Sequence, residues 1–173
     1  MKLKPLQGVL HRQHDRGEVE TAQLTSSNNR ISHSARIMIM TDNRYEMREF
    51  CRGRKVLLVD DNPDVLYLLN DLLRRSLEVE VSTAQNGKVA VEAAKDIQPD
   101  LILMDLMMPV MDGLEAISKI KDDESTNKIP VVAITALINT YQRDDVMKHG
   151  FVECLEKPLD FDQLKDMVFR YIA

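Results

Sequence analysis

The chain has 173 residues, with 23 Lys and Arg against 28 Asp and Glu, and its formal net charge is −5 at pH 7. This length is enough for one well-buried domain with some chain left over. Two cysteines are too few for a disulfide framework, and no apolar stretch approaches the ~20 residues that span a bilayer. Composition therefore excludes a disulfide-rich scaffold and a membrane span. Because no apolar signal segment opens the chain, we expect a cytoplasmic protein.

Charge and polarity divide the chain near residue 53. Residues 1–53 contain nine Lys and Arg against six Asp and Glu, whereas residues 54–173 contain fourteen against twenty-two. The acidic second part argues against nucleic acid as a direct partner, because phosphate contacts need clustered Lys and Arg. The first part is polar and lacks a hydrophobic period, most clearly over residues 25–34. We therefore expect a poorly ordered N-terminal extension over 1–53 and one folded domain over 54–173.

Apolar runs and helical periods alternate through the second part. Strands are predicted at about 55–60, 79–83, 100–105, 130–135 and 151–155. Helices are predicted at about 63–75, from Gly87, at about 113–121, 139–150 and 161–172. Apolar strands that alternate with helices form a parallel sheet with helices on both faces, so the predicted class is α/β, doubly wound.

Local signals define several helix ends. Asn62 is a typical N-cap, and Pro63 suits the first helical position because its missing N–H would be unpaired there anyway. Asn86 opens the next helix, and Gly150 is expected to end the helix at 139–150 in the left-handed region. The predicted core faces of the first two helices are Val65, Leu66, Leu68, Leu69, Leu72 and Leu73, followed by Val89, Ala90, Ala93 and Ala94.

Five polar residues stand at or just past the carboxyl ends of the predicted strands: Asp60, Asp61, Asp105, Thr135 and Lys157. Ligands of open parallel sheets bind at this edge, so we expect these side chains to converge on one acidic pocket. Mg²⁺ prefers oxygen ligands and would relieve repulsion among the three carboxylates. A carboxylate beside such an ion can attack phosphorus, and the hydroxyl and ammonium can bind phosphoryl oxygens.

Each residue has an ordinary structural explanation when taken alone. An Asp-Asp pair is more often a solvated turn or a helix cap, and Asp105 suits a simple turn. Thr135 could satisfy local backbone, and Lys157 could be a surface charge. These explanations weaken because all five residues fall at the same ends of successive strands. Because Pro158 follows it, residue 157 is expected to be extended, and this conformation could aim its ammonium into the pocket.

Four stretches together resemble the receiver domain of two-component response regulators: residues 55–63, 103–113, 134–136 and 156–159. The intervals agree as well, with 44 residues from Asp61 to Asp105, 30 more to Thr135 and 22 more to Lys157. The resemblance covers about 54–173 and leaves the first 53 residues unexplained. It implies a flavodoxin-like five-stranded sheet of order 2-1-3-4-5.

The resemblance also implies a function. Asp105 would be the phosphoacceptor, taking a phosphoryl group from a phosphohistidine on a sensor histidine kinase or a histidine phosphotransfer protein. Asp61 would ligate Mg²⁺ directly and Asp60 directly or through water, with the backbone carbonyl of Met107 as a further ligand. Thr135 and Lys157 would bind the phosphoryl group as switch residues. Pro109, Gly113 and Pro158 would shape the loops around them.

Two departures from the family pattern stand out. The switch position three residues before Lys157 is usually Tyr or Phe, and here it is Cys154. We expect a small buried apolar residue there rather than a redox group, so the aromatic half of the switch is in doubt. The positions two beyond Asp105 and Thr135 are the apolar Met107 and Leu137, which cannot orient an attacking water. A long-lived phosphoaspartate is therefore expected.

Phosphorylation is expected to reach partners through one face of the domain. Inward movement of Thr135 and Lys157 should shift the face made by the helix at 139–150, the strand at 151–155 and the helix at 161–172. That face would bind an unknown downstream protein or a second copy of the chain. Leu137, Ile138 and Tyr141 could be exposed there, or could simply cover the sheet edge.

Three other functions compete. A haloacid dehalogenase-type phosphatase also uses Asp, Thr, Lys and Mg²⁺, but it needs a second acid two residues after its nucleophile, where this chain has Met107. A receiver-like binding module that works without phosphorylation would not need the intact acidic cluster. A flavodoxin shares the fold, but Asp60 and Asp61 would repel the phosphate of FMN. We therefore expect a phosphoacceptor rather than an enzyme.

Overall fold

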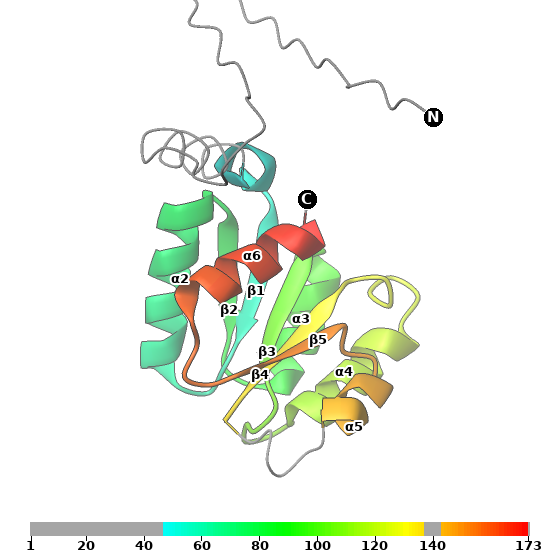
Figure 1. Ribbon diagram of the computed structural model, residues 1–173. Coiled ribbons are helices and arrows are strands. Elements are labelled where there is room, and N and C mark those ends of the chain that lie inside the picture. Colours follow the sequence, from blue (N-terminus) through cyan, green and yellow to red (C-terminus); the bar gives the residue numbers. More distant parts are fainter. Residues whose placement is uncertain (1–46, 137–142, 173) are drawn as a thin grey trace, which may run out of the picture. The chain divides into compact units, whose positions relative to one another are not determined.

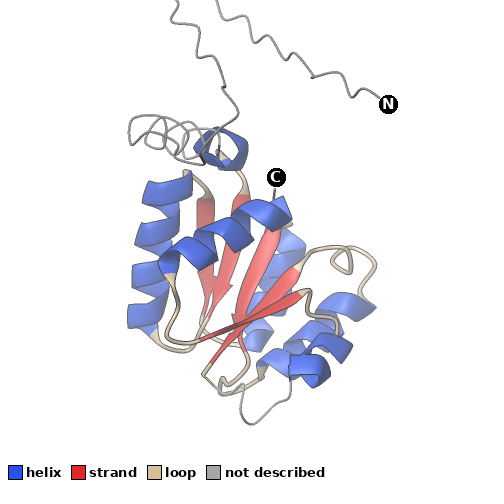
Figure 2. Ribbon diagram, in the orientation of Figure 1, coloured by secondary structure: helices blue, strands red, loops and turns tan. Residues whose placement is uncertain are grey.

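The computed structural model describes residues 47–136 and 143–172. They form a five-stranded parallel sheet in the order β2-β1-β3-β4-β5, with helices on both faces (Figures 1 and 2). This order confirms the predicted doubly wound, flavodoxin-like α/β fold. The strands are β1 (Lys55–Val59), β2 (Glu80–Ala84), β3 (Leu101–Asp105), β4 (Val131–Thr135) and β5 (Glu153–Glu156). The helices are α2 (Pro63–Leu77), α3 (Gly87–Ile97), α4 (Gly113–Asp122), α5 (Arg143–Lys148) and α6 (Phe161–Ile172).

Two apolar layers enclose the sheet. One layer joins side chains of α2 and α6 to one face of the strands, through residues such as Leu73, Leu103 and Val168. The other joins α3, α4 and the single buried residue of α5 to the opposite face, through residues such as Ile102 and Ile117. The middle strands β3 and β4 are buried at every position, as expected of parallel strands covered on both sides.

Helix starts follow the predicted caps. The side-chain oxygen of Asn62 accepts a hydrogen bond from the backbone N–H of Asp64 at 2.9 Å, with Pro63 as the first helical residue. Asn86 accepts from the N–H of Val89 at 3.0 Å. These contacts satisfy amide groups that have no partner within the helix, which explains why α2 and α3 begin where the sequence predicts.

Two residues predicted to face the core do not. Leu68 is 53% exposed on α2, and Val89 is 41% exposed on α3. The buried face of α2 follows a spacing of three and four residues, from Leu66 through Leu69 and Leu73. Leu68 lies off that line, because a helix turns by about 100° per residue. An apolar residue next to a core position of a helix therefore need not face the core.

A short helix over residues 47–51 precedes β1. It lies before the predicted boundary between the extension and the domain, yet Cys51 is fully buried in the core layer beneath α2 and α6. Ordered packing therefore begins upstream of residue 54. The first 46 residues of the predicted poorly ordered extension lie outside the described residues.

Helix α5 lies within the helix predicted at 139–150, and Gly150 follows it with a φ of 103°. This positive φ confirms the predicted glycine stop, because side chains other than glycine are strained there. Leu137, Ile138 and Tyr141, which were expected near the start of that helix, lie outside the described residues. In the described ranges, no helix is long and apolar enough to cross a membrane.

Leu73 and Leu68 offer a matched test of the packing of α2. Leu73→Ala removes a fully buried side chain, and we expect the free energy of unfolding to fall by about 2–5 kcal/mol. Leu68→Ala on the same helix should change it by about 0.5 kcal/mol or less, because that side chain is already mostly in water. Urea unfolding followed by circular dichroism measures both, and equal losses would contradict this packing.

Candidate functional site: an acidic pocket at the strand ends

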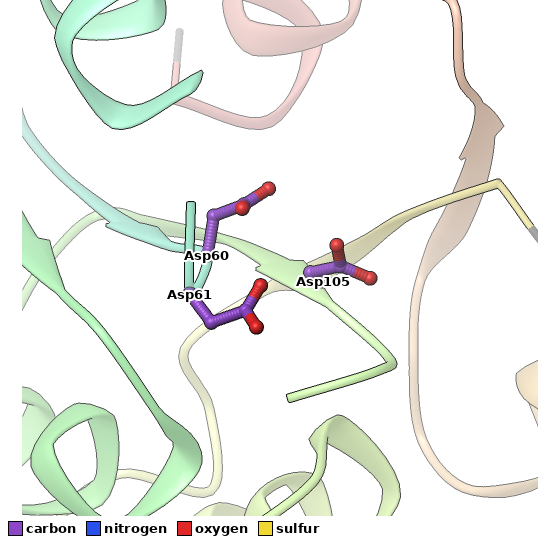
Figure 3. A group of neighbouring side chains, drawn as sticks. All are labelled: Asp60, Asp61 and Asp105. Atoms are coloured by element: carbon purple, nitrogen blue, oxygen red, sulfur yellow. The ribbon is translucent and has the colours of Figure 1, made fainter. Parts of the chain in front are cut away.

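The three predicted carboxylates meet at the carboxyl edge of the sheet. Asp60 and Asp61 directly follow β1, and Asp105 is the last residue of the neighbouring strand β3. One oxygen from each of the three side chains lies within 4.8 Å of the others, and Figure 3 shows the three side chains at neighbouring strand ends. Asp60 and Asp105 are buried, whereas Asp61 is exposed. The pocket is therefore lined by two buried carboxylates and one carboxylate that is open to solvent.

Lys157, just past β5, contacts both buried carboxylates. Its Nζ donates to Asp60 Oδ2 and to Asp105 Oδ2, each at 2.6 Å. The lysine side chain is 23% exposed, and its partners are less exposed still. Charged groups that are removed from water need partners of opposite charge close by. Lys157 is that partner for both carboxylates, and they are its partners. The ammonium therefore neutralises much of the repulsion between Asp60 and Asp105.

The pocket keeps Lys157 charged. Burial by itself would lower the pKa of this ammonium, but its hydrogen bonds to Asp105 and Asp60, together with their negative charges, raise the pKa overall. Lys157 is therefore a fixed positive charge at neutral pH. A phosphoryl group that arrived at Asp105 would meet a cation already in place.

Backbone amides orient the two buried carboxylates. The N–H of Asn62 donates to Asp60 Oδ1 at 2.9 Å, and the N–H of Met107 donates to Asp105 Oδ1 at 3.1 Å. Each carboxylate thus has one oxygen on an amide and the other on Lys157. Both side chains are held in place by groups two residues further along the chain, which a sequence pattern alone does not reveal.

This donor set fits a hard divalent cation. Three carboxylates with oxygen atoms within 4.8 Å supply the ligand type that Mg²⁺ prefers, and the exposed side of Asp61 leaves room for bound water. The same set offers no thiolate or imidazole, which would favour softer metals. The residues present are therefore compatible with magnesium.

Thr135 ends β4 beside β5 and is 1% exposed. Its backbone carbonyl accepts a hydrogen bond from the N–H of Lys157 at 2.9 Å. The two predicted phosphoryl-binding residues are thus adjacent across the strand pair. This bond ties the backbone of the residue after β5 to the end of β4.

The loop after Asp105 is shaped by close backbone contacts. The N–H of Gly113 donates to the carbonyl of Leu106 at 3.0 Å, and a Cβ placed on Gly113 would lie 2.5 Å from the carbonyl oxygen of Asp105. Only glycine fits at this approach. The N–H of Met111 donates back to the carbonyl of Pro109 at 2.9 Å, which tightens the turn between them.

Two other predicted residues have defined positions. Lys157–Pro158 is a cis peptide bond. Cys154 is 2% exposed and pairs in register with Ala133 of β4. Burial raises the pKa of the Cys154 thiol, which disfavours the reactive thiolate. Its environment is that of the small buried residue expected from the sequence.

This arrangement belongs to a known family. The family model of the response regulator receiver domain matches residues 56–169, which is more than half of the chain. The chain belongs to the response regulator receiver family. Receiver domains are phosphoacceptors of two-component signal transduction, interact with histidine kinases and bind Mg²⁺ at their acidic site.

Curated relatives share this receiver domain in proteins of different sizes. The histidine-protein kinase BarA of Escherichia coli K12 is 37% identical over 116 residues, which make up 67% of this chain and 12% of BarA. The response regulator DivK of Brucella anthropi is 31% identical over 120 residues, or 69% of this chain and 97% of DivK. The chain thus spans a small part of BarA and nearly all of DivK.

Solved receiver structures agree with the fold. The receiver domain of the sensor histidine kinase PA1611 from Pseudomonas aeruginosa has a TM-score of 0.64 and 33% identity, over 69% of this chain and 98% of that one. That structure contains a magnesium ion coordinated in its active site cleft. The chemotaxis regulator CheY4 of Vibrio cholerae has a TM-score of 0.63 and 26% identity, over 69% of this chain and 98% of that one.

Gly113 tests how closely the receiver loop supports Asp105. Gly113→Ala places a methyl group against backbone atoms of Asp105 and Leu106 that cannot rotate away, so we expect a loss of about 1–3 kcal/mol in unfolding free energy. Ser118→Ala, at an exposed position of the same helix, is the control and should have little effect. Equal stability of the two variants in urea would show that the loop adapts freely.

Proposed function

We propose that this receiver domain accepts a phosphoryl group on Asp105 from a phosphohistidine donor, either a sensor histidine kinase or a histidine phosphotransfer protein. The observation that carries the proposal is the double contact of Lys157, whose ammonium lies 2.6 Å from both Asp60 and Asp105. This contact places a permanent cation beside a carboxylate that is held by a backbone amide. Such a site suits a carboxylate that must accept and then hold a negatively charged phosphoryl group.

The chemical step needs only positioning and charge. A carboxylate oxygen of Asp105 attacks phosphorus, forming the P–O bond, while the P–N bond to the donor imidazole breaks and its electron pair stays on nitrogen. Asp105 is 9% exposed, so a donor must reach it through the open side of the pocket. Lys157 is already placed to bind a phosphoryl oxygen.

Asp60, Asp61 and Asp105 would hold Mg²⁺, with the backbone carbonyl of Met107 as a fourth ligand. The ion would neutralise charge on the transferring phosphoryl oxygens. Asp61 is the exposed member of the cluster, and the ion pairs of Lys157 are with Asp60 and Asp105, so the Asp61 carboxylate is the most accessible to a cation. Pro109, Gly113 and Pro158 would preserve the loop geometry around these ligands.

A phosphoryl group on Asp105 would shift the residues at the ends of β4 and β5. It adds close to two negative charges, which would draw Thr135 and Lys157 toward it. The backbone bond between these residues would couple their movements. Full switching between two states requires ~5 kcal/mol of differential binding. Cys154, at the position that is usually aromatic in the family, is too small to fill the volume that Thr135 would vacate.

The output face would be formed by α5, β5 and α6, the helix, strand and helix beyond the switch residues. An unknown downstream protein or a second copy of this chain would bind there in the cytoplasm. Residues 54–173 would be the receiver unit and residues 1–53 its extension. A direct role in nucleic-acid binding is disfavoured by the acidic charge of the receiver unit.

Phosphatase activity is the less favoured alternative. Leu106 and Met107 follow Asp105, so no second acid stands two residues after it to protonate a leaving group. Phosphorylation-independent binding is disfavoured by the intact acidic cluster. Asp105 would therefore support its own phosphorylation and slow hydrolysis without turning over phosphate esters.

Acetyl phosphate with Mg²⁺ tests the acceptor. We expect intact mass spectrometry to show one added phosphoryl group, labile to hydroxylamine and mapped to Asp105. Asp105→Asn should abolish the adduct, because an amide is a much weaker nucleophile. Asp112→Asn changes the carboxylate that caps α4 and should leave the adduct intact. An adduct that persists in Asp105→Asn would contradict the assignment.

Mg²⁺ titration tests the ligand set. We expect Asp61→Asn to weaken Mg²⁺ binding at least about tenfold, as measured by calorimetry, because it removes the most exposed carboxylate of the cluster. Asp64→Asn alters a nearby exposed carboxylate in the first turn of α2 and should bind Mg²⁺ like the unmodified protein. Unchanged affinity in Asp61→Asn would rule out this site.

The lifetime of the phosphoaspartate tests the apolar position two residues after the acceptor. We expect slow loss of the adduct, and several-fold faster loss in Met107→Asn, because an amide can orient an attacking water where a thioether cannot. Val110→Asn changes another exposed apolar residue of the same loop and should keep the slow rate. Decay within seconds in the unmodified protein would refute the prediction.

A further inference from the structure

The short helix over residues 47–51 lies outside the residues that match the receiver family. It nevertheless packs against the domain at the end of the sheet opposite the acidic pocket, beside the last turn of α6 (Figure 1). The ring of Phe50 meets Phe169 of α6 edge to face, with centroids 6.2 Å apart. Cys51 is fully buried, in the same core cluster as Val168 and Ile172.

Glu78 fastens this segment to the end of α2. Its carboxylate forms ion pairs with Arg48 and Arg52, both at 2.9 Å, and its backbone carbonyl accepts the N–H of Gly53 at 3.2 Å. Glu78 itself has a φ of 56°, in the left-handed region where Gly or Asn is usual. The two ion pairs to the preceding segment explain why glutamate occupies this position.

These contacts form the dock, by which we mean the attachment of residues 47–52 to α2 and α6, and this attachment can open. Both arginine side chains are about half exposed, and exposed ion pairs contribute little because water competes for them. Phe50 remains 62% exposed even when docked. Cys51 is the one residue of residues 48–52 that is wholly buried. Segments with few buried contacts open at low cost, so a small change in their surroundings shifts the balance.

Helix α6 connects the dock to the pocket. Asp160, three residues after Lys157, caps its N-terminus. The Asp160 side chain accepts a hydrogen bond from the N–H of Gln163. Phe169 stands near the opposite end of this 12-residue helix. A helix of this length moves largely as one body, because its backbone bonds run from end to end. Movement of Lys157 would therefore reach Phe169.

We propose that residues 47–52 form a docking segment whose attachment to α2 and α6 is loosened when Asp105 is phosphorylated, so that the receiver transmits its state to the chain upstream. The inference rests on the proposed function. It adds a second output route, at the opposite end of the sheet from the pocket. The group that binds to α2 and α6 at this end is a segment of the same chain, the one that leads into β1.

The Cys51 thiol reports docking directly. Docked, it is buried and burial raises its pKa, so iodoacetamide should label it slowly. Undocked, it is exposed to the reagent. Labelling of the full-length chain is followed on the Cys51 peptide by mass spectrometry. Cys154, buried in the other core layer, reveals any global unfolding.

Variants first test the dock in the unphosphorylated protein. Phe50→Ala and Glu78→Gly should each raise the rate of Cys51 labelling at least about fivefold, with Cys154 unchanged. Glu78→Gly suits the φ of 56° and so removes the two ion pairs without straining α2. Tyr67→Ala, an exposed aromatic on α2, is the matched control and should not alter the rate. Unchanged Cys51 labelling in both dock variants would overturn the proposal.

Phosphorylation then tests the coupling. With acetyl phosphate and Mg²⁺, and with the Asp105 adduct confirmed by mass, Cys51 labelling should rise in the unmodified chain, and Asp105→Asn should abolish that rise. A confirmed adduct with unchanged Cys51 labelling would overturn this inference and leave the proposed function standing. Absence of any adduct would overturn both, because the signal would have no source.

Discussion

The bridge from Lys157 to Asp60 and Asp105 is the interaction on which the pocket depends. Two nearly buried carboxylates at adjacent strand ends would repel each other strongly without a cation between them. The ammonium comes from the residue after β5, on the far side of β4, so the bridge forms only when β1, β3, β4 and β5 lie side by side in this order. The site therefore depends on the arrangement of these four strands.

The sheet order also determines how charge at the pocket becomes movement elsewhere. Lys157 is bonded through its backbone to Thr135 and stands just before the cap of α6. A phosphoryl group would attract the lysine side chain, while the surrounding core is close-packed and resists gradual deformation. Change at one end of α6 is therefore expected to appear at its other end, where Phe169 meets Phe50.

Sequence patterns failed where packing between elements decides. Leu68 and Val89 lie beside core positions in their helices, and only the placement of the helix axis on the sheet shows that they face solvent. Glu78 in a left-handed conformation is explained by Arg48 and Arg52, which a local turn rule does not consider. The burial of Cys51 likewise depends on contacts with a helix more than a hundred residues away.

The sequence alone determined the alternation of strands and helices, the caps at Asn62 and Asn86, and the presence of five polar groups at strand ends. These follow from hydrophobic periods and local backbone preferences, which act within a few residues. Tertiary structure alone decided that Lys157 contacts both Asp60 and Asp105, and that Cys51 belongs to the core. The two Lys157 contacts join residues 97 and 52 positions apart, so they exist only once the chain has folded.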